Sequence, residues 1–175
     1  GALDPATWPN TGIGLNNPDG AEGTCSACNS RHQFSTEQAR QPENTGKCHL
    51  GTDHRQKEIY EESKHGNAYY TNIKEMNLDA DSWIAGVDYY AAPTCASCHM
   101  SATREQAVTQ DVGNRISWTL RPIVSVKQTG WEEKRKNMLD VCSACHGKRF
   151  PNKNFYQFDA LVELYNQKFA KTALE

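Results

Sequence analysis

The chain has 175 residues, of which 23% are charged, and its formal net charge is −2. Only 27 residues, about 15%, are Leu, Ile, Val or Phe, which is below the roughly 20% at which a chain begins to look disordered. Four Trp, seven Tyr and seven Cys nevertheless argue against disorder. The composition therefore predicts a folded chain in which something other than aliphatic side chains fills the interior.

Several classes of protein are excluded at this level. No window approaches 18 consecutive apolar residues, so no membrane span is expected. No basic start precedes an apolar run, which leads us to expect a mature chain without a signal peptide. The near-neutral balance excludes nucleic acid as a partner. The one short basic run, 134–136, directly follows two Glu residues and is typical of a solvated helix face.

The first half of the chain contains signals for an irregular arm and two short helices. Residues 1–24 are rich in Pro and Gly and predict an irregular N-terminal arm. Ser35, followed three residues later by Gln, predicts a capped helix ending at Gln41 before a proline. A further helix is expected over 55–65, with Gly66 as its C-terminal stop.

The second half is expected to be more regular. Ser101 predicts the start of a helix through Gln110, and a helix is expected over 131–145. Residues 154–173 show an apolar stripe at helical spacing, formed by Phe155, Phe158, Leu161, Val162, Tyr165 and Phe169. Strand signals are weak, so the predicted fold class is mainly α with much irregular loop.

Six of the seven cysteines form three CxxC pairs, and two of these pairs continue into histidine. These two motifs are Cys95-Ala-Ser-Cys98-His99 and Cys142-Ser-Ala-Cys145-His146. CxxCH is the attachment motif of haem c. Two thiols one helical turn apart reach the two vinyl groups, and the adjacent imidazole reaches the iron. The sequence therefore predicts two haems c.

Other uses of these cysteines are weaker. A zinc ribbon pairs two CxxC knuckles about 15–20 residues apart, whereas 43 residues separate Cys98 from Cys142. A thioredoxin-like pair needs a βαβ context, which is not visible. The odd cysteine count argues against a plain disulfide framework.

Two further motifs are incomplete. Cys25-Ser-Ala-Cys28 is followed by Asn29 in place of the proximal histidine, and Cys48-His49 has Thr45 where the first cysteine would stand. A third haem at Cys48 and His49 would hang from a single thioether. The alternatives are a local disulfide or dithiol for the first pair and a buried thiol for Cys48.

Six histidines supply the expected iron ligands. His99, His146 and, if its haem binds, His49 are proximal by motif. His32, His54 and His65 remain as candidates for sixth ligands, although a lone histidine is more often a surface or capping residue. His49 and His54 are too close in sequence to share one iron, so His54 would serve a neighbouring haem.

These motifs, with several segments around them, resemble octahaem hydroxylamine oxidoreductase. The matching segments are 25–35, 39–40, 42–43, 48–49, 51, 53–54, 58–66, 92–103, 111–122, 141–146 and 164–169. The resemblance covers nearly the whole chain but only the part of the family that carries its last four haems. It implies a multihaem cytochrome c architecture organised around covalently bound haems.

The chain also departs from that family. The family would have His at Asn29, Cys at Thr45 and His at Gln110. Four bis-His haems need eight histidines, and restoring positions 29 and 110 to the present six gives that number. We hypothesise that Asn29 and Gln110 replace the axial pair of one haem and so delete it.

The family's catalytic haem is crosslinked to a Tyr of a neighbouring subunit in a trimer, and its motif lies upstream of the present segment. The resemblance makes Tyr156 or Tyr165 the candidate crosslinking residue and implies a homotrimer. The leading hypothesis is an electron-transfer module with another cytochrome as redox partner. The alternative is an oxidoreductase acting on hydroxylamine, hydrazine or another small nitrogen compound at an open haem.

The sequence predicts three parts: an arm (1–24), a haem-binding domain (25–150) and a C-terminal amphipathic helix (151–175). Attachment of haem c takes place outside the cytoplasm, so a periplasmic or equivalent location is expected.

Overall fold

The computed structural model describes residues 25–30, 32–52, 55–119 and 123–174. The predicted arm and His54 lie outside the described residues. The chain divides into two compact units, Gly1–Gly113 and Asn114–Glu175, and each is described here by itself. The three-part division expected from the sequence remains a prediction.

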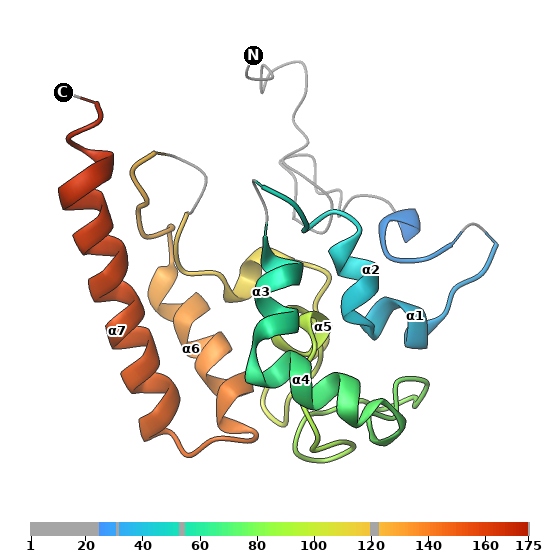
Figure 1. The fold of residues 1–175 in the computed structure, drawn as a ribbon. Helices are drawn as coiled ribbons and strands as arrows, with labels where there is room; N and C mark the ends of the chain where they lie inside the picture. The colour runs from blue at the N-terminus through green and yellow to red at the C-terminus, as the bar shows by residue number, and fades with distance from the viewer. Residues whose placement is uncertain (1–24, 31, 53–54, 120–122, 175) are drawn as a thin grey trace. The chain divides into compact units, whose positions relative to one another are not determined.

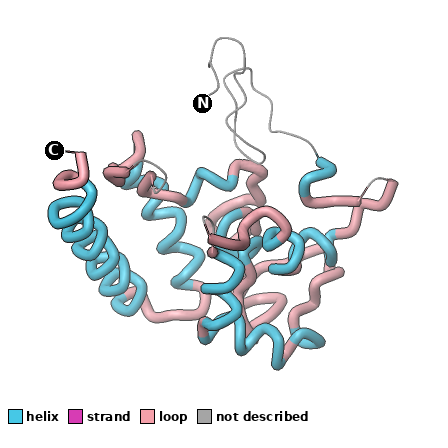
Figure 2. Tube along the Cα trace, turned by 45° about the horizontal axis from the view of Figure 1, so that its top comes forward, coloured by secondary structure: helices cyan, strands magenta, loops and turns pink. Residues whose placement is uncertain are grey.

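The first unit is built from short helices joined by long loops (Figure 1). Its elements are η1 (Cys25–Ala27), α1 (Thr36–Arg40), α2 (Pro42–Gly46), α3 (Gln56–Glu62), α4 (Lys64–Thr71), η2 (Ile73–Glu75) and α5 (Cys95–His99). A 3-10 turn, η3 (Val112–Arg115), follows at the boundary between the units. Within the described residues only isolated β-bridges occur, and the tube in Figure 2 shows helices and loops alone. The mainly α fold class with much loop is confirmed.

The predicted cap at Ser35 is present. The Ser35 hydroxyl accepts a hydrogen bond from the Gln38 backbone N–H at 3.1 Å, and α1 ends at Arg40. Pro42 begins α2 directly afterwards, since proline tolerates the first turn of a helix but cannot continue one. The two short helices therefore follow from local signals.

The helix predicted over 55–65 is wrong at its end. Two helices form instead, and Ser63 caps the second by accepting a hydrogen bond from the Gly66 backbone N–H at 3.1 Å. Gly66 lies inside α4, where a Cβ atom would stand 2.1 Å from the Tyr60 carbonyl oxygen. This glycine permits a close approach of α4 to α3 and does not stop a helix.

The helix predicted to start at Ser101 is also wrong. Residues 101–111 are irregular. The Ser101 hydroxyl donates to the Ala96 carbonyl at 3.0 Å, and so satisfies a carbonyl near the end of α5. The serine thus serves the helix that precedes it.

Aromatic and small side chains dominate the core of the first unit. Its buried members are Tyr69, Met76, Leu78, Trp83, Tyr89, Ala92 and Ala96. Trp83 and Tyr89 stack with ring centroids 4.6 Å apart, and the Trp83 indole N–H donates to the Met76 carbonyl at 2.7 Å. Leu78 is the single Leu, Ile, Val or Phe in this cluster, in keeping with the composition.

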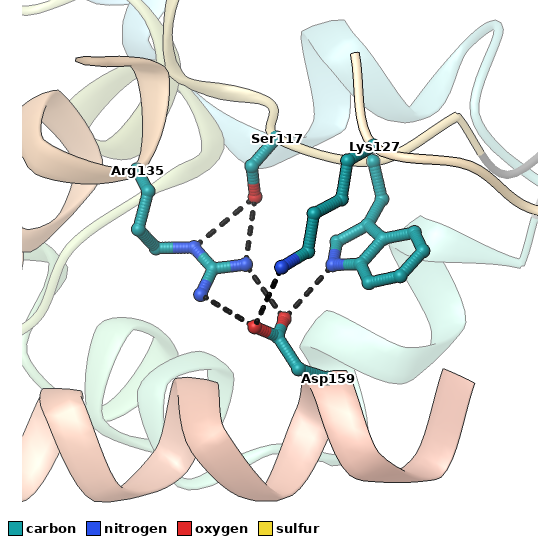
Figure 3. A network of polar contacts seen from close by, with 5 residues as sticks. Ser117, Lys127, Arg135 and Asp159 are labelled. Carbon is teal, nitrogen blue, oxygen red and sulfur yellow. Dashed lines mark hydrogen bonds and ion pairs between the residues drawn. The ribbon is translucent and has the colours of Figure 1, made fainter. Parts of the chain in front are cut away.

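The second unit packs α6 (Trp131–Ser143) against α7 (Arg149–Tyr165), which continues as a π-helical turn, η4 (Asn166–Ala170). A polar network joins α6, α7 and the preceding loop (Figure 3). Asp159 on α7 accepts hydrogen bonds from Arg135 on α6 at 2.7 and 3.2 Å and from the Trp118 indole at 2.8 Å. Arg135 also donates to the Ser117 hydroxyl at 2.9 Å.

The apolar stripe predicted for the last helix does not form a core. Of its members only Val162 is buried, and Phe155 is half-buried. The other four are exposed: Phe158, Leu161, Tyr165 and Phe169. The helix itself is present and begins earlier than predicted, at Arg149. No helix in the described part of the chain is long and apolar enough to cross a membrane.

Candidate functional site

The first complete CxxCH motif forms the single-turn helix α5. Thr94 caps this turn reciprocally: its hydroxyl accepts from the Ser97 backbone N–H at 3.4 Å, and the Ser97 hydroxyl accepts from the Thr94 backbone N–H at 2.9 Å. Residues three apart on a helix lie on one side of it. The cap therefore holds Cys95 and Cys98 on one side, as attachment to two vinyl groups requires.

Ser97, between the two cysteines, also ties α5 to the core. Its hydroxyl accepts a hydrogen bond from the buried Tyr89 phenol, and Tyr89 stacks on Trp83. Buried polar groups that are all hydrogen-bonded fix a single arrangement. The motif is therefore anchored to the core through Ser97, one of the two residues between its cysteines.

The thiols of this motif lie in a partly buried environment. Burial raises the pKa of Cys95, and a hydrogen bond with the Thr45 hydroxyl offsets part of that effect. Cys95 therefore carries a protonated thiol at neutral pH. The contact also shows that Thr45 on α2 lies beside the first complete motif.

The second complete motif lies at the end of α6. The backbone N–H groups of Cys145 and His146 both donate to the Cys142 carbonyl, at 3.3 and 3.0 Å, so the turn stays helical although α6 ends at Ser143. Burial raises the pKa of the Cys142 and Cys145 thiols. The His146 ring lies 4.9 Å from the Phe150 ring.

A shallow open hollow follows the second motif. It is lined by Gly147, Lys148, Arg149, Phe150 and Lys153. Lys148, Arg149 and Lys153 thus place three cations near the second motif, with the Phe150 ring beside His146.

The incomplete motifs lie close to α2. The backbone N–H groups of Cys48 and His49 both donate to the Thr45 carbonyl at 3.2 Å, so Thr45 stands one turn before Cys48, where a first cysteine would be. Cys48 is exposed, and the alternative of a buried thiol is therefore wrong. The Asn44 side chain donates to the Cys28 carbonyl at 2.6 Å, which links both incomplete motifs.

The structure assigns no sixth ligand to either complete motif. His32, His49 and His65 are exposed, and His99 and His146 are half-buried. His54 lies outside the described residues. The assignment of sixth ligands stays a prediction.

Both candidate crosslinking tyrosines lie on α7 and face solvent. Tyr156 is 77% exposed and Tyr165 is 51% exposed. Tyr165 belongs to the apolar stripe, and its ring centroid lies 5.8 Å from that of Phe169. Both residues keep their place as candidates.

Sequence reasoning missed the neighbours of the first motif. Tyr60 donates to the Pro93 carbonyl at 2.9 Å, and Thr45 contacts Cys95. Neither contact has a local signal, because the partners are about 30 and 50 residues apart. The cap at Thr94 did have one: a Thr followed three residues later by a Ser that can cap in return.

The donor set fits haem c better than zinc. Each complete motif offers two thiols and a histidine within one helical turn. Within the described residues no cluster of three or more His, Cys, Asp or Glu is placed to hold a metal ion, whereas a structural zinc site needs four ligands.

Comparisons with known proteins agree with this donor set. A probable nitrite reductase-hydroxylamine oxidoreductase fusion protein of Kuenenia stuttgartiensis is 31% identical over 149 residues, covering 69% of this chain and 17% of that protein. A solved hypothetical multiheme protein superposes with a TM-score of 0.79 at 25% identity, covering 95% of this chain and 46% of the other.

A second solved structure is the reducing HAO-like protein complex of Kuenenia stuttgartiensis, with a TM-score of 0.65 and 26% identity over 81% of this chain and 33% of that chain. The chain thus spans less than half the length of each of these relatives. A family model described as "Seven times multi-haem cytochrome CxxCH" matches residues 14–173. The chain therefore belongs to this family of multihaem c-type cytochromes and is related to the hydroxylamine oxidoreductase-like proteins.

Proposed function

We propose that the chain carries electrons through haems c attached at Cys95 and Cys98 and at Cys142 and Cys145. The observation that supports this best is the contrast between the motifs: two offer both thiols and a histidine within one helical turn, and the other two each lack one of these groups. When bound, haem c supplies a one-electron iron couple.

The residues of the chain set the properties of these sites. His99 and His146 would occupy the fifth position of each iron. Axial ligand identity, hydrogen bonding and burial set the potential of such a site. The cap at Thr94 and the Tyr89–Ser97 hydrogen bond hold the first motif on packed elements, which keeps the position of its histidine constant.

The other histidines and the incomplete motifs have the roles expected from the sequence. His32, His54 and His65 are the candidates for sixth ligands, and they would leave the irons six-coordinate. Cys48 and His49 would hold a third haem through one thioether. Asn29 and Gln110 would remove the fourth.

The setting of the protein follows from its cofactor. Haem c is attached outside the cytoplasm, so we place the chain in the periplasm or an equivalent compartment. Since a similar solved structure is described as a protein complex, we infer that the redox partner is another cytochrome. The trimer implied by the family resemblance would use the exposed face of α7.

Haem stoichiometry and spectra test this proposal. Intact mass and a pyridine haemochromogen assay should give two haems per chain, or three if Cys48 also binds one. In the latter case Cys48→Ser should lose one haem, whereas Cys28→Ser should lose none. The spectrum should be low-spin, and the reduced protein should not bind CO. Four haems would contradict the deletion, and a high-spin spectrum with rapid CO binding would favour the oxidoreductase.

A further inference from the structure

A group of positive charges follows the second haem-attachment motif, at the link between α6 and α7 (Figure 1). Lys148, Arg149 and Lys153 line the open hollow together with Phe150, and all four side chains are exposed. We call these four residues the basic patch. Residues 141–158 contain the three cations and no Asp or Glu, although the whole chain has a net charge of −2. The patch is therefore a local positive surface on a slightly acidic chain.

Helix stability does not explain the basic patch. The start of α7 has no side-chain cap and no acidic residue in its first turn, whereas the helix dipole favours negative charge at that end and disfavours positive charge. Elsewhere, Lys57 and Lys136 each pair with a Glu on their own helix, at 2.7 and 3.4 Å. Within the part of the chain that the structure describes, no carboxylate forms such an ion pair with a cation of the patch. Their charge is thus available to an external partner.

The basic patch lies next to an expected iron ligand. The Phe150 ring centroid lies 4.9 Å from that of His146, and Phe150 is 56% exposed. Surfaces that exchange electrons in short-lived encounters are small, and complementary charges around them guide the approach of the partner. An exposed ring beside the iron ligand, with cations close to it, provides both features. Electron transfer at such a surface needs no open iron position, so it is compatible with six-coordinate haem.

We propose that the basic patch is the docking site of the redox partner, and that the partner presents a carboxylate-rich surface there. This inference rests on the proposed function, because it requires haem at Cys142 and Cys145. Carboxylates of the partner pair with the three cations, and Phe150 provides the apolar contact between them. One electron passes across this contact between the partner and the haem site, without bond formation or proton transfer.

Two other uses of the same cations predict different results. If the cations paired with the propionates of the chain's own haem, their replacement would shift the reduction potential of that haem. If they bound a membrane surface, the chain would sediment with vesicles of anionic phospholipid. Docking of an acidic protein predicts instead a rate of electron transfer that falls as salt is added.

The test measures electron transfer from flavodoxin hydroquinone, an acidic protein donor, to the ferric haem-loaded chain by stopped flow. Each flavin hydroquinone loses one electron and becomes a semiquinone, and one ferric iron becomes ferrous. We expect the second-order rate constant to fall with rising ionic strength. The double variant Lys148→Gln, Lys153→Gln should lower the rate constant about three- to tenfold at an ionic strength of about 0.1 M and weaken its salt dependence.

The matched control is the double variant Lys168→Gln, Lys171→Gln. It changes the net charge by the same amount, and its lysines are also exposed. They lie in and just after η4, at the other end of the same helix, about 30 Å away at a rise of about 1.5 Å per residue. That distance is about three Debye lengths at this ionic strength, so the control should change the rate constant less than about 1.5-fold. Circular dichroism checks that both variants keep the fold.

Three results would overturn the proposal. The first is an equal rate constant for the two double variants. The second is a haem potential in Lys148→Gln, Lys153→Gln that is shifted enough to account for its slower rate. The third is loss of binding to anionic phospholipid vesicles in that variant while its rate stays unchanged. A mass without haem at the second motif defeats this inference together with the proposed function, whereas any of these three results in a loaded chain defeats the docking site alone.

Discussion

Asp159 is predicted to be the main electrostatic support of the second unit. Its carboxylate accepts from Arg135 and Trp118 (Figure 3), and the Arg135 and Asp159 side chains are 10% and 25% exposed. Removing one partner of a buried ion pair costs about 3–5 kcal/mol. Because Asp159 is partly solvated and asparagine keeps one acceptor, we expect Asp159→Asn to lower the free energy of unfolding by about 2–3 kcal/mol.

A surface pair in the same unit provides the control. Lys136 and Glu133 lie 3.4 Å apart on α6, and both side chains are exposed, so Glu133→Gln should cost less than about 0.5 kcal/mol. Urea unfolding of the haem-loaded proteins, followed by far-UV circular dichroism, measures both values. A cost for Asp159→Asn that equals the cost for Glu133→Gln would refute the reasoning.

The same carboxylate makes a prediction about pH. Burial acts to raise the pKa of Asp159, but hydrogen bonds from Arg135 and Trp118 outweigh burial and hold it below its usual value. The unfolded chain, with an Asp pKa of about 3.9, therefore binds the proton more readily than the folded chain. The contribution of Asp159 is complete above about pH 5 and is lost as pH falls through the folded pKa. The stability difference between unaltered protein and Asp159→Asn should narrow over that range, and a constant difference would argue against the shift.

Two further predictions concern packing. Gly66→Ala should lower the free energy of unfolding by about 1–3 kcal/mol, because the added Cβ would meet the backbone of Tyr60 and Glu61. The control, Gly147→Ala, should be neutral or slightly stabilising, because nothing lies within 4 Å of its Cβ position. Equal thermal unfolding midpoints for the two variants would contradict the predicted difference. Replacing the four cysteines of the complete motifs by serine should leave a largely unfolded chain, measured by circular dichroism and hydrogen exchange, and a compact haem-free chain would show that the composition was misinterpreted.

The features that the sequence predicted correctly have their causes within a few residues. The cap at Ser35 and the helix predicted over 131–145, which the structure has as Trp131–Ser143, each depend on neighbours one turn away. The spacing of a CxxCH motif is likewise local, because the thiols and the proximal histidine attach to one porphyrin. Such features can be recognised without knowing where the rest of the chain lies.

The features that were predicted wrongly depend on distant contacts. Gly66 looked like a helix stop, but its role comes from the carbonyl of Tyr60 on another helix. Ser101 looked like a helix start, but its hydroxyl bonds back to α5. A local signal of the same form can serve either the helix before it or the helix after it, and only tertiary structure decides between them.

The difference between local signals and distant contacts also applies to the two axial ligands expected for each haem. His99 and His146 each directly follow a cysteine of a CxxCH motif, so the expected fifth ligands can be named from the sequence. A sixth ligand is brought to the iron by the packing of elements around the porphyrin, and the porphyrin is itself a large part of what they pack against. In a chain with so few aliphatic residues, the apolar side chains of Phe158, Leu161, Tyr165 and Phe169 on α7 remain exposed. We therefore expect the attached haems to contribute to the core of this chain as well as to its chemistry.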